Sequence, residues 1–504
     1  MMSVNRLCSP HRQGLTMRPL TICALAISLV TACDEPTRPA MTPHLPKAPG
    51  LALIVAPPID LGTLGGSFST ALAINALGQV VGYSAIASNL QGHAFMWRSG
   101  TGMTDLGTLG GTFSQAVAVN ALGQVVGNIA LASGFTHGFS WQSGQGMVDI
   151  GTLGGAATQA RAINVLGQVV GSSNRGSDQQ THAFLWRAGT GMTDLGTLGG
   201  STSDAFAVNE LGQVVGSSTM PGDLQRHAFL WRSGTGMIDL GTLGGTNSGA
   251  VAINALGQVV GNSYTASGED HAFSWQAATG MTDLGTLGGV SSQARGVNAL
   301  GQVIGKARIP IGGEHAFLWQ SGAPMIDIGT LGYLSDAWAV NDLGQVVGYS
   351  VTTAEEGHAF LWEKTTGMTD LGTLGSDYSA ALAINDRGQI VGEAGNATGV
   401  LIVHAVLWNT LNPPTPAEQV ATLTDLVNRL AAAGTLNQGQ ANALLAKLEA
   451  VTRHLNKGDK KSAANLLQAF INQVRALVNA GIVSAADGQT LIDAAQKLID
   501  ELSA

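Results

Sequence analysis

The sequence predicts an all-β eight-bladed β-propeller of four-stranded blades, followed by a small all-α four-helix domain. Three observations lead to this prediction. The segment His-Ala-Phe-Met-Trp at residues 93–97 returns in recognisable form eight times, at intervals of 43 to 46 residues. Each period also carries one Asp-Leu-Gly-Thr-Leu-Gly-like and one Asn-x-x-Gly-Gln-Val-Val-Gly-like segment, and short apolar runs between glycines are typical of propeller blades. Beyond residue 418 the apolar residues recur at helical spacing.

The N-terminal region predicts export and a lipid anchor. Arg18 precedes an apolar stretch at residues 20–29 that is too short to span a bilayer and leads to Val30-Thr31-Ala32-Cys33. This pattern resembles a bacterial lipoprotein signal with its lipobox, which implies a signal peptide over residues 1–32 and lipidation of Cys33. Met17 is a possible true start, because it places Arg18 directly before the apolar stretch. We expect secretion across the inner membrane and a chain that is lipid-anchored in the bacterial envelope or on the cell surface.

Prolines mark two connecting segments. Seven of the 15 prolines lie between Pro36 and Pro58, and three more lie in residues 413–416. Such segments act as extended tethers. The chain therefore divides into a tether at residues 33–58, a repeat array at 59–409, a hinge at 410–417 and a tail at 418–504.

Composition limits the class of partner. Glycine supplies 69 of 504 residues, about twice the usual share of about 7%, and has no collagen-like period, so the glycines mark turns. Charged residues make up 11% of the chain, and the net charge is −9. A polyanion such as DNA would be repelled, so nucleic acid is not expected as a partner.

One period, residues 69–111, contains four short strands. They read Ala-Leu-Ala-Ile-Asn, Gln-Val-Val-Gly-Tyr, His-Ala-Phe-Met-Trp and Met-Thr-Asp-Leu-Gly-Thr-Leu, with glycine-bearing connections. Side chains alternate across a strand, and neither face of the third strand is polar along its length. Both faces are therefore expected to be buried between neighbouring sheets.

The two ends of the array predict closure. A lone Asp-Leu-Gly-Thr-Leu segment at residues 60–64 precedes the first Asn segment, and no such segment follows Trp408. The N-terminal strand would then complete the eighth blade and leave no open edge. A linear solenoid would instead need polar capping repeats, and none is visible in the sequence.

These motifs resemble HAF repeats, a family of bacterial extracellular repeats named for His-Ala-Phe as at residues 93–95. The resemblance covers residues 59–409 and implies a secreted or surface-exposed repeat protein, without supplying an activity. Two copies depart from the pattern, at Gly138 and Val406. The loss of the aromatic residue at Val406 predicts a looser final blade.

The repeated histidines are predicted to be structural. Imidazole is a common metal ligand, so a ring of histidines could in principle bind metal. A residue used once in every blade is more economically a packing or hydrogen-bonding element, and we expect each histidine to contact an aspartate or a backbone group. No metal site and no cofactor are predicted. The histidines are His93, His137, His182, His227, His271, His315, His358 and His404.

Function is expected where the copies differ. Variable loops, such as residues 83–92 and 306–314, lie on one side of a rigid ring, where binding sites are common. On the first strand of each repeat, two positions vary between aliphatic, polar, charged and aromatic residues. Amide and carboxylate groups beside aromatic rings suit a sugar or peptide; alternatively, these side chains only fill a wide central channel. The candidate ligand-binding residues are Gln115, Gln159, Arg161, Asp204, Phe206, Gln293, Arg295, Asp336 and Trp338.

A catalytic role is the less favoured alternative. Propellers host glycosidases and lyases, and the pair to consider is Asp204 and Asp336. These residues fall in the fourth and seventh blades, whereas glycoside hydrolysis needs two carboxylates roughly 5 to 9.5 Å apart. The repeats also lack the common hydrolase and nucleotide-binding motifs. No catalytic residue is predicted.

The tail predicts four helices. Apolar residues recur at helical spacing in runs that end at Gly434, Gly458 and Gly481, and the fourth run opens at Ser484 with a capping box that uses Asp487. An offset of 47 residues superposes the two halves, so two helical hairpins are expected to pack together. Residues 436–440 and 470–474 resemble the FIMAH domain, a helical module of secreted bacterial proteins. That resemblance covers about residues 418–502 and implies attachment or interaction, with no settled chemistry.

Together these features predict a non-catalytic, lipid-anchored binding scaffold outside the cytoplasm. A polysaccharide is the favoured ligand because amides and aromatics meet on the first strands. Another protein is the next choice, through acidic loops such as residues 269–270 and 355–356. A glycan-active propeller enzyme and a purely structural envelope protein remain as alternatives.

Overall fold

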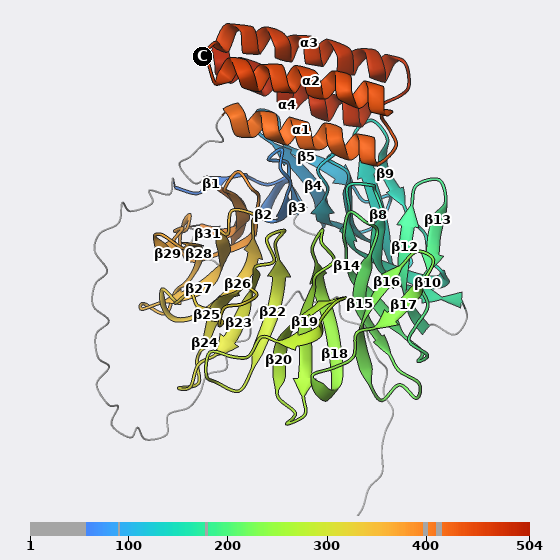
Figure 1. The fold of residues 1–504 in the computed structure, drawn as a ribbon, viewed down its shortest axis with the longest axis vertical. Helices are drawn as coiled ribbons and strands as arrows, with labels where there is room; N and C mark the ends of the chain where they lie inside the picture. The colour runs from blue at the N-terminus through green and yellow to red at the C-terminus, as the bar shows by residue number, and fades with distance from the viewer. Residues whose placement is uncertain (1–56, 89–90, 177–179, 397–401, 410–415, 504) are drawn as a thin grey trace, which may run out of the picture. The chain divides into compact units, whose positions relative to one another are not determined.

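The computed structural model describes residues 57–88, 91–176, 180–396, 402–409 and 416–503. Within these residues, each repeat forms a four-stranded antiparallel unit, and four helices follow (Figure 1). The predicted class of repeated β-sheets followed by an α-helical tail is confirmed at this level. The predicted signal peptide, the lipidation site at Cys33 and most of the tether lie outside the described residues.

The strands have the following bounds. The first strands of the repeats are β2 (Gly65–Ile74), β6 (Phe113–Val119), β10 (Gly154–Ile163), β14 (Ser203–Val208), β18 (Gly244–Ile253), β22 (Ser292–Val297), β26 (Gly332–Val340) and β30 (Gly375–Ile384). The second strands are β3 (Val80–Ile86), β7 (Val125–Ala130), β11 (Val169–Arg175), β15 (Val214–Thr219), β19 (Val259–Thr265), β23 (Val303–Arg308), β27 (Val346–Thr352) and β31 (Gln389–Asn396).

The third strands carry the His-Ala-Phe motif: β4 (Gly92–Arg98), β8 (Thr136–Gln142), β12 (Gln180–Arg187), β16 (Arg226–Arg232), β20 (Asp270–Gln276), β24 (Glu314–Trp319), β28 (Gly357–Glu363) and β32 (Val403–Asn409). The fourth strands are β5 (Gly102–Gly107), β9 (Gly146–Asp149), β13 (Gly191–Asp194), β17 (Gly236–Asp239), β21 (Gly280–Asp283), β25 (Ile326–Asp327), β29 (Gly367–Asp370) and, for the last repeat, β1 (Ile59–Asp60).

Sheet order follows chain order. Six repeats form separate four-stranded sheets, and a single parallel bridge from Gly357 to Tyr378 joins the seventh and eighth repeats into one eight-stranded sheet. In the eighth repeat, β1 pairs antiparallel with β32, with Ile59 opposite Leu407 and Asp60 opposite Val406. The prediction that the N-terminal strand completes the last repeat is therefore confirmed.

A β-bulge interrupts the first strand of every repeat. In the first repeat, the register between β2 and β3 shifts between Ala71 and Ala73, so that Leu72 is the extra residue. The glycine of Val-Val-Gly lies against the same segment, and a Cβ on Gly82 would stand 1.9 Å from the carbonyl oxygen of Thr70. The equivalent glycines face the equivalent carbonyls at 1.9 to 2.0 Å. Only glycine permits this approach, which explains its presence in all eight copies.

A series of asparagine hydrogen bonds links successive repeats. The Nδ2 atom of the asparagine that follows each first strand donates to the backbone oxygen of the corresponding asparagine in the next repeat, at 2.9 to 3.1 Å. The series runs through Asn75, Asn120, Asn164, Asn209, Asn254, Asn298, Asn341 and Asn385 and returns from Asn385 to Asn75. The first strands follow the same order, since β2 contacts both β6 and β30.

Phenylalanine fills the centre of the sheet packing in seven repeats, where the motif residue is fully buried. The eighth repeat has Val406 there, which is also fully buried. The expectation that this sheet packs more loosely was therefore wrong. Trp408 is fully buried in this repeat, and its indole nitrogen donates to the backbone oxygen of Leu371 at 2.8 Å. A tryptophan stands at this position in every repeat, and in the last repeat its complete burial fills volume that the smaller Val406 leaves.

The helical tail consists of α1 (Pro416–Ala432), α2 (Gln438–Leu455), α3 (Lys460–Asn479) and α4 (Ala485–Ser503). α1 begins two residues before the predicted domain start at 418, within the predicted hinge. The side chain of Asn437 caps α2 in a capping box with Gln440. At α4, Ser484 Oγ accepts from the Asp487 backbone at 3.0 Å and donates to the Asp487 carboxylate at 2.7 Å. None of the described helices is long and apolar enough to cross a bilayer.

The tail shares part of its apolar core with the repeats. Leu122 and Val165, in the turns after two first strands, are buried in the same cluster as the helical residues. Thr490 on α4 donates from Oγ1 to the backbone oxygen of Leu122 at 3.2 Å. Leucines at the position of Leu122 in the fourth to seventh repeats are exposed, as for Leu256 at 81%.

The asparagine series yields a stability prediction. In Asn254, Oδ1 accepts from the backbone of Leu256 at 3.1 Å and of Gln258 at 3.0 Å, while Nδ2 donates to Asn298. We expect Asn254→Ala to lower the free energy of unfolding by about 2–3 kcal/mol, because it leaves buried backbone groups unpaired. Urea denaturation measures this. Leu256→Ala, in the same turn but exposed, serves as the control and should change the value by less than about 0.5 kcal/mol. Equal effects of the two substitutions would contradict this role.

Candidate functional site

The bulge residues of the first strands are the starting point of the candidate site. They are Leu72, Val117, Arg161, Phe206, Val251, Arg295, Trp338 and Leu382. A bulge redirects one side chain out of the regular alternation of a strand. Since the first strands of adjacent repeats contact each other, the bulge side chains of successive repeats come into proximity. Four of these eight residues were predicted as ligand residues from their chemistry alone.

In the third and fourth repeats, a cationic side chain lies on an aromatic ring. The guanidinium carbon of Arg161 lies 4.6 Å from the centroid of the Phe206 ring. Asp204, two residues before Phe206, forms an ion pair with Arg226 on β16, and Arg226 also donates from Nε to Ser217 Oγ at 2.7 Å. Burial lowers the pKa of Arg161; the Asp204 charge counteracts this effect and the Arg226 charge adds to it. Arg161, Asp204 and Phe206 therefore form one group.

In the sixth and seventh repeats, the equivalent arginine is paired. Arg295 donates from a terminal nitrogen to Asp336 Oδ2 at 2.9 Å. The Asp336 side chain is only 14% exposed, and its other oxygen, Oδ1, is buried without a hydrogen-bond partner among the described residues. Gln293, on the same strand as Arg295, donates to Asp270 Oδ2 at 3.0 Å.

An aromatic and carboxylate cluster joins the seventh, eighth and first repeats. Trp338 stacks on Tyr349, with ring centroids 6.1 Å apart and an interplanar angle of 7°, and Tyr349 lies 6.2 Å from Tyr378. The Tyr378 hydroxyl donates to Glu393 Oε1 at 3.0 Å, and Thr70 Oγ1 donates to Glu393 Oε2 at 2.8 Å. The Glu393 carboxylate is thus held by hydroxyl groups from two repeats, at the end of the series of rings formed by Trp338, Tyr349 and Tyr378.

Sequence reasoning missed Tyr349, Tyr378 and Glu393. Tyr349 and Glu393 occupy the position after Val-Val-Gly, on the second strand. A signal for them was present, because this position is as variable as the bulge position: it reads Tyr83, Asn128, Ser172, Ser217, Asn262, Lys306, Tyr349 and Glu393. Its side chains reach the first strand of the next repeat, as when Asn128 Oδ1 accepts from the backbone of Ala160 at 2.8 Å.

Tyr378 acts as a hydrogen-bond donor. Its pKa lies well above the ordinary value, first because the phenol is buried and then because the Glu393 charge lies beside it. A phenol with a raised pKa keeps its proton at neutral pH and is a poor nucleophile. Tyr378 is therefore suited to donate a hydrogen bond rather than to act as a nucleophile.

The nine predicted ligand residues do not converge on one point. Arg161, Asp204 and Phe206 form the group of the third and fourth repeats, and Arg295, Asp336 and Trp338 belong to the sixth and seventh. Gln293 is hydrogen-bonded to Asp270 near the second group. The remaining two, Gln115 (half-buried) and Gln159 (exposed), lie on β6 and β10. Asp204 and Asp336, considered above as a catalytic pair, are each paired with an arginine.

All eight motif histidines contact an aspartate. Their Nδ1 atoms lie 2.7 to 3.0 Å from the carboxylates of Asp105, Asp149, Asp194, Asp239, Asp283, Asp327, Asp370 and Asp60, in chain order of the histidines. The same aspartates accept a backbone hydrogen bond from the glycine two residues on, as Asp105 does from Gly107 at 2.7 Å. Among the described residues, no group of three or more histidines, cysteines or carboxylates could hold a metal ion.

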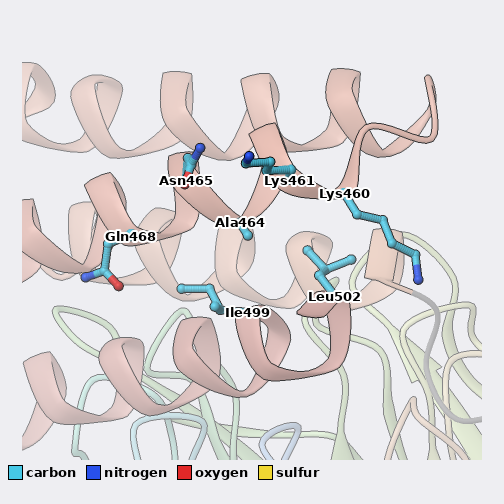
Figure 2. Close-up of a pocket in the computed structure, with 7 residues that line it drawn as sticks. All are labelled: Lys460, Lys461, Ala464, Asn465, Gln468, Ile499 and Leu502. Carbon is cyan, nitrogen blue, oxygen red and sulfur yellow. The ribbon is translucent and has the colours of Figure 1, made fainter. Parts of the chain in front are cut away.

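Two cavities lie away from these clusters. One, of about 330 Å³, is bounded by the ends of several first strands and by the asparagine turns, including Asn298, Asn341 and Asp342. The other, of about 480 Å³, lies in the helical tail between the start of α3 and the end of α4 (Figure 2). None of the nine predicted ligand residues lines either cavity.

The fold and these clusters define a protein of repeated four-stranded antiparallel sheets with a C-terminal helical domain. Residues 420–500 match the FIMAH domain family, so the resemblance predicted for the tail is confirmed. No curated protein matches the sequence.

Several solved structures are similar at low identity. A puromycin hydrolase mutant complexed with PGG is 12% identical, with 66% of this chain and 59% of that chain covered and a TM-score of 0.41. This chain thus spans about three fifths of that protein. AofleA from Arthrobotrys oligospora is 9% identical over 61% of this chain and 88% of that chain, with a TM-score of 0.30. A mutant of the Aleuria aurantia lectin in complex with Fucalpha1-6GlcNAc is 11% identical over 61% and 96%, with a TM-score of 0.27. Values this low support no inference about ligand or activity.

The Glu393 cluster yields the next prediction. We expect Glu393→Ala to reduce the free energy of unfolding by about 1–3 kcal/mol, because the half-buried Tyr378 and the buried Thr70 lose the acceptor of their hydroxyl groups. Glu393→Gln keeps one carbonyl acceptor and should cost less. A double-mutant cycle with Tyr378→Phe, followed by urea denaturation, should give a coupling of about 0.5 kcal/mol or more. Strictly additive effects would show that the two side chains do not interact.

Proposed function

We propose that this protein is a non-catalytic, lipid-anchored binding scaffold outside the cytoplasm, and that its ligand is a polysaccharide. The observation that carries the proposal is a series of aromatic rings that runs from Trp338 through Tyr349 to Tyr378 and ends at the Glu393 carboxylate. Stacked aromatic faces beside fixed hydrogen-bonding groups match the apolar faces and hydroxyl groups of sugar rings. Trp338, Tyr349 and Glu393 are half-buried, so each keeps some surface for a ligand.

The proposal includes a closed eight-bladed propeller of HAF repeats that presents this cluster. Three links from the last repeat to the first, and one from the last repeat to its N-terminal strand β1, support closure. Asn385 donates to Asn75, and the Ala405 backbone donates to Ser69 Oγ at 2.9 Å. His404 lies 2.8 Å from Asp60, and the carboxylate of Glu393 accepts from Thr70. A ring without a free sheet edge gives the cluster a rigid support.

Two features support a non-catalytic role. The carboxylates of Asp204 and Asp336 are each neutralised by an arginine, which does not suit a general acid or base that must exchange a proton. The raised pKa of Tyr378 makes it unsuited to the roles of nucleophile and general base, in which a tyrosine must lose its proton. A glycan-active enzyme and a purely structural envelope protein are the alternatives that the binding experiment below addresses.

A protein partner is the second candidate. Loops between second and third strands, and nearby segments, expose large apolar side chains, such as Leu224 at 91% and Ile311 at 82%. Apolar residues on loops are common in protein-binding surfaces. Binding at these loops would be independent of Trp338.

A binding assay tests the proposed ligand. The full chain is titrated with a panel of bacterial cell-wall and extracellular polysaccharides, with isothermal calorimetry as the readout. We expect Trp338→Ala to weaken the bound glycan at least about tenfold, equivalent to about 1.4 kcal/mol. Val251→Ala removes an apolar side chain from the equivalent bulge of the fifth repeat and should leave the affinity unchanged. Unchanged affinity in Trp338→Ala would place the binding site on the loops instead. Turnover of a glycan would indicate an enzyme. If no glycan binds, a protein partner or a structural role would be favoured.

A second experiment tests the anchor. Cys33→Ser removes the thiol that a lipobox presents for lipidation, so we expect this variant to lose labelling with a radioactive fatty acid when expressed in a bacterium. Cys23→Ser, within the predicted signal peptide, is the matched control and should be labelled like the wild type. Labelling of Cys33→Ser, or absence of labelling in the wild type, would contradict a lipid anchor at Cys33.

A further inference from the structure

Two arginines occupy equivalent bulges but have different surroundings. Arg161 in the third repeat and Arg295 in the sixth are both followed, in the next repeat, by an aspartate at the same position of the first strand. These aspartates are Asp204 and Asp336. Arg295 forms an ion pair with Asp336 at 2.9 Å, whereas Arg161 takes part in none of the ion pairs found among the described residues. The repeat would allow the same ion pair twice, yet it forms only once.

Arg226 accounts for this difference. It precedes the motif histidine of the fourth repeat, where the other repeats have no basic residue, and its guanidinium forms the ion pair with Asp204. A hydrogen bond from Arg226 Nε to Ser217 Oγ at 2.7 Å fixes its orientation. In the seventh repeat the corresponding residue is Gly357, which has no side chain to compete for Asp336. Asp204 is therefore paired with Arg226 and does not serve as an ion-pair partner for Arg161.

The positive charge of Arg161 forms no direct ion pair with a carboxylate of the described residues. Its guanidinium lies over the Phe206 ring, 4.6 Å from the centroid, and its Nε is buried without a hydrogen-bond partner among the described residues. Counting Arg161, Arg226 and Asp204, the group carries two positive charges and one negative charge. Burial and the Arg226 charge lower the pKa of Arg161, so an anion at this position would be stabilised by a desolvated cation.

We infer that Arg161, stacked on Phe206, binds a carboxylate of the ligand, and that the ligand is a polysaccharide containing uronic acid. This inference rests on the proposed function for the glycan nature of the ligand. A guanidinium matches a carboxylate in a planar, two-pronged arrangement, and stacking on an aromatic ring holds the guanidinium plane in place. The net charge of −9 disfavours densely charged polyanions. The ligand therefore carries its carboxylates at intervals, separated by neutral sugars.

The test compares two polymers that differ only in the carboxylate. Hyaluronan has one glucuronate in each disaccharide, and chemical reduction of its carboxyl groups yields the neutral counterpart. The full chain should bind hyaluronan at least about tenfold more tightly than the reduced polymer, which corresponds to about 1.4 kcal/mol. Arg161→Ala should abolish this preference, and Arg161→Lys should retain only part of it, because an ammonium lacks the planar geometry.

Two further variants sharpen the comparison. Arg295→Ala removes the equivalent arginine that is already paired with Asp336, so the preference for hyaluronan should persist. Arg226→Ala releases Asp204 to pair with Arg161, as Asp336 pairs with Arg295, so the preference should fall although Arg161 is still present. A structural role of Arg161 alone would not predict the effect of Arg226→Ala. Circular dichroism of each variant checks that the sheets remain folded.

The outcomes separate this inference from the proposed function. Equal binding of both polymers, with loss of binding in Trp338→Ala, would leave the glycan-binding function standing and overturn the carboxylate assignment. A preference that survives Arg161→Ala, or that Arg295→Ala removes equally, would also overturn it. Failure to bind either polymer would overturn the inference, and the neutral glycans of the panel would then decide the proposed function separately. Binding of polyglutamate with the same dependence on Arg161 would assign the site to an acidic peptide instead.

Discussion

The hydrogen bond from each turn asparagine to the next repeat is the interaction on which the rest of this structure depends. One amide performs two tasks, because its oxygen closes the turn after the first strand and its nitrogen joins that turn to the following repeat. These buried contacts join the ends of adjacent first strands in the same way in every repeat. The buried motif phenylalanines fill the space between the sheets. The same side chain therefore stabilises a local turn and a contact between repeats. Because this contact recurs in every repeat, it links all the first strands in series.

That framework determines where variation can occur without loss of packing. The bulge residue of the first strand lies outside the regular register of the sheet, and the residue after Val-Val-Gly lies opposite the first strand on the second strand. The glycine beside the bulge must remain, since a Cβ would collide with a backbone carbonyl. The bulge side chain itself is free to be aliphatic, basic or aromatic. The architecture thus confines chemical diversity to a few positions, where residues of neighbouring repeats meet.

Small differences between copies then produce distinct local chemistry on the same backbone. Arg226 diverts Asp204 from Arg161, whereas Gly357 leaves Asp336 to Arg295. Tyr378 and Thr70 hold the Glu393 carboxylate with hydroxyl groups, at a position where no other repeat has a carboxylate. Such a surface is asymmetric even though the backbone repeats, and asymmetry is what recognition of an extended, directional ligand needs.

The sequence by itself determined the repeat period, the strand order within each repeat, the pairing of the N-terminal strand with the last repeat, and the helical tail with its FIMAH resemblance. These features follow from local periodicity, from glycine turns and from counting strand motifs at the two ends of the array. It also indicated Arg161, Phe206 and Trp338 by their unusual chemistry at a repeated position. Only the tertiary structure decided which of the predicted residues meet and that Tyr349 links Trp338 to Tyr378 and Glu393. It also decided that Trp408 is completely buried in the last repeat and that Arg161 forms no ion pair with a described residue. The physical reason is that these outcomes depend on contacts between residues far apart in the chain, and a β-bulge changes the direction of a side chain without leaving a mark in the pattern of alternation.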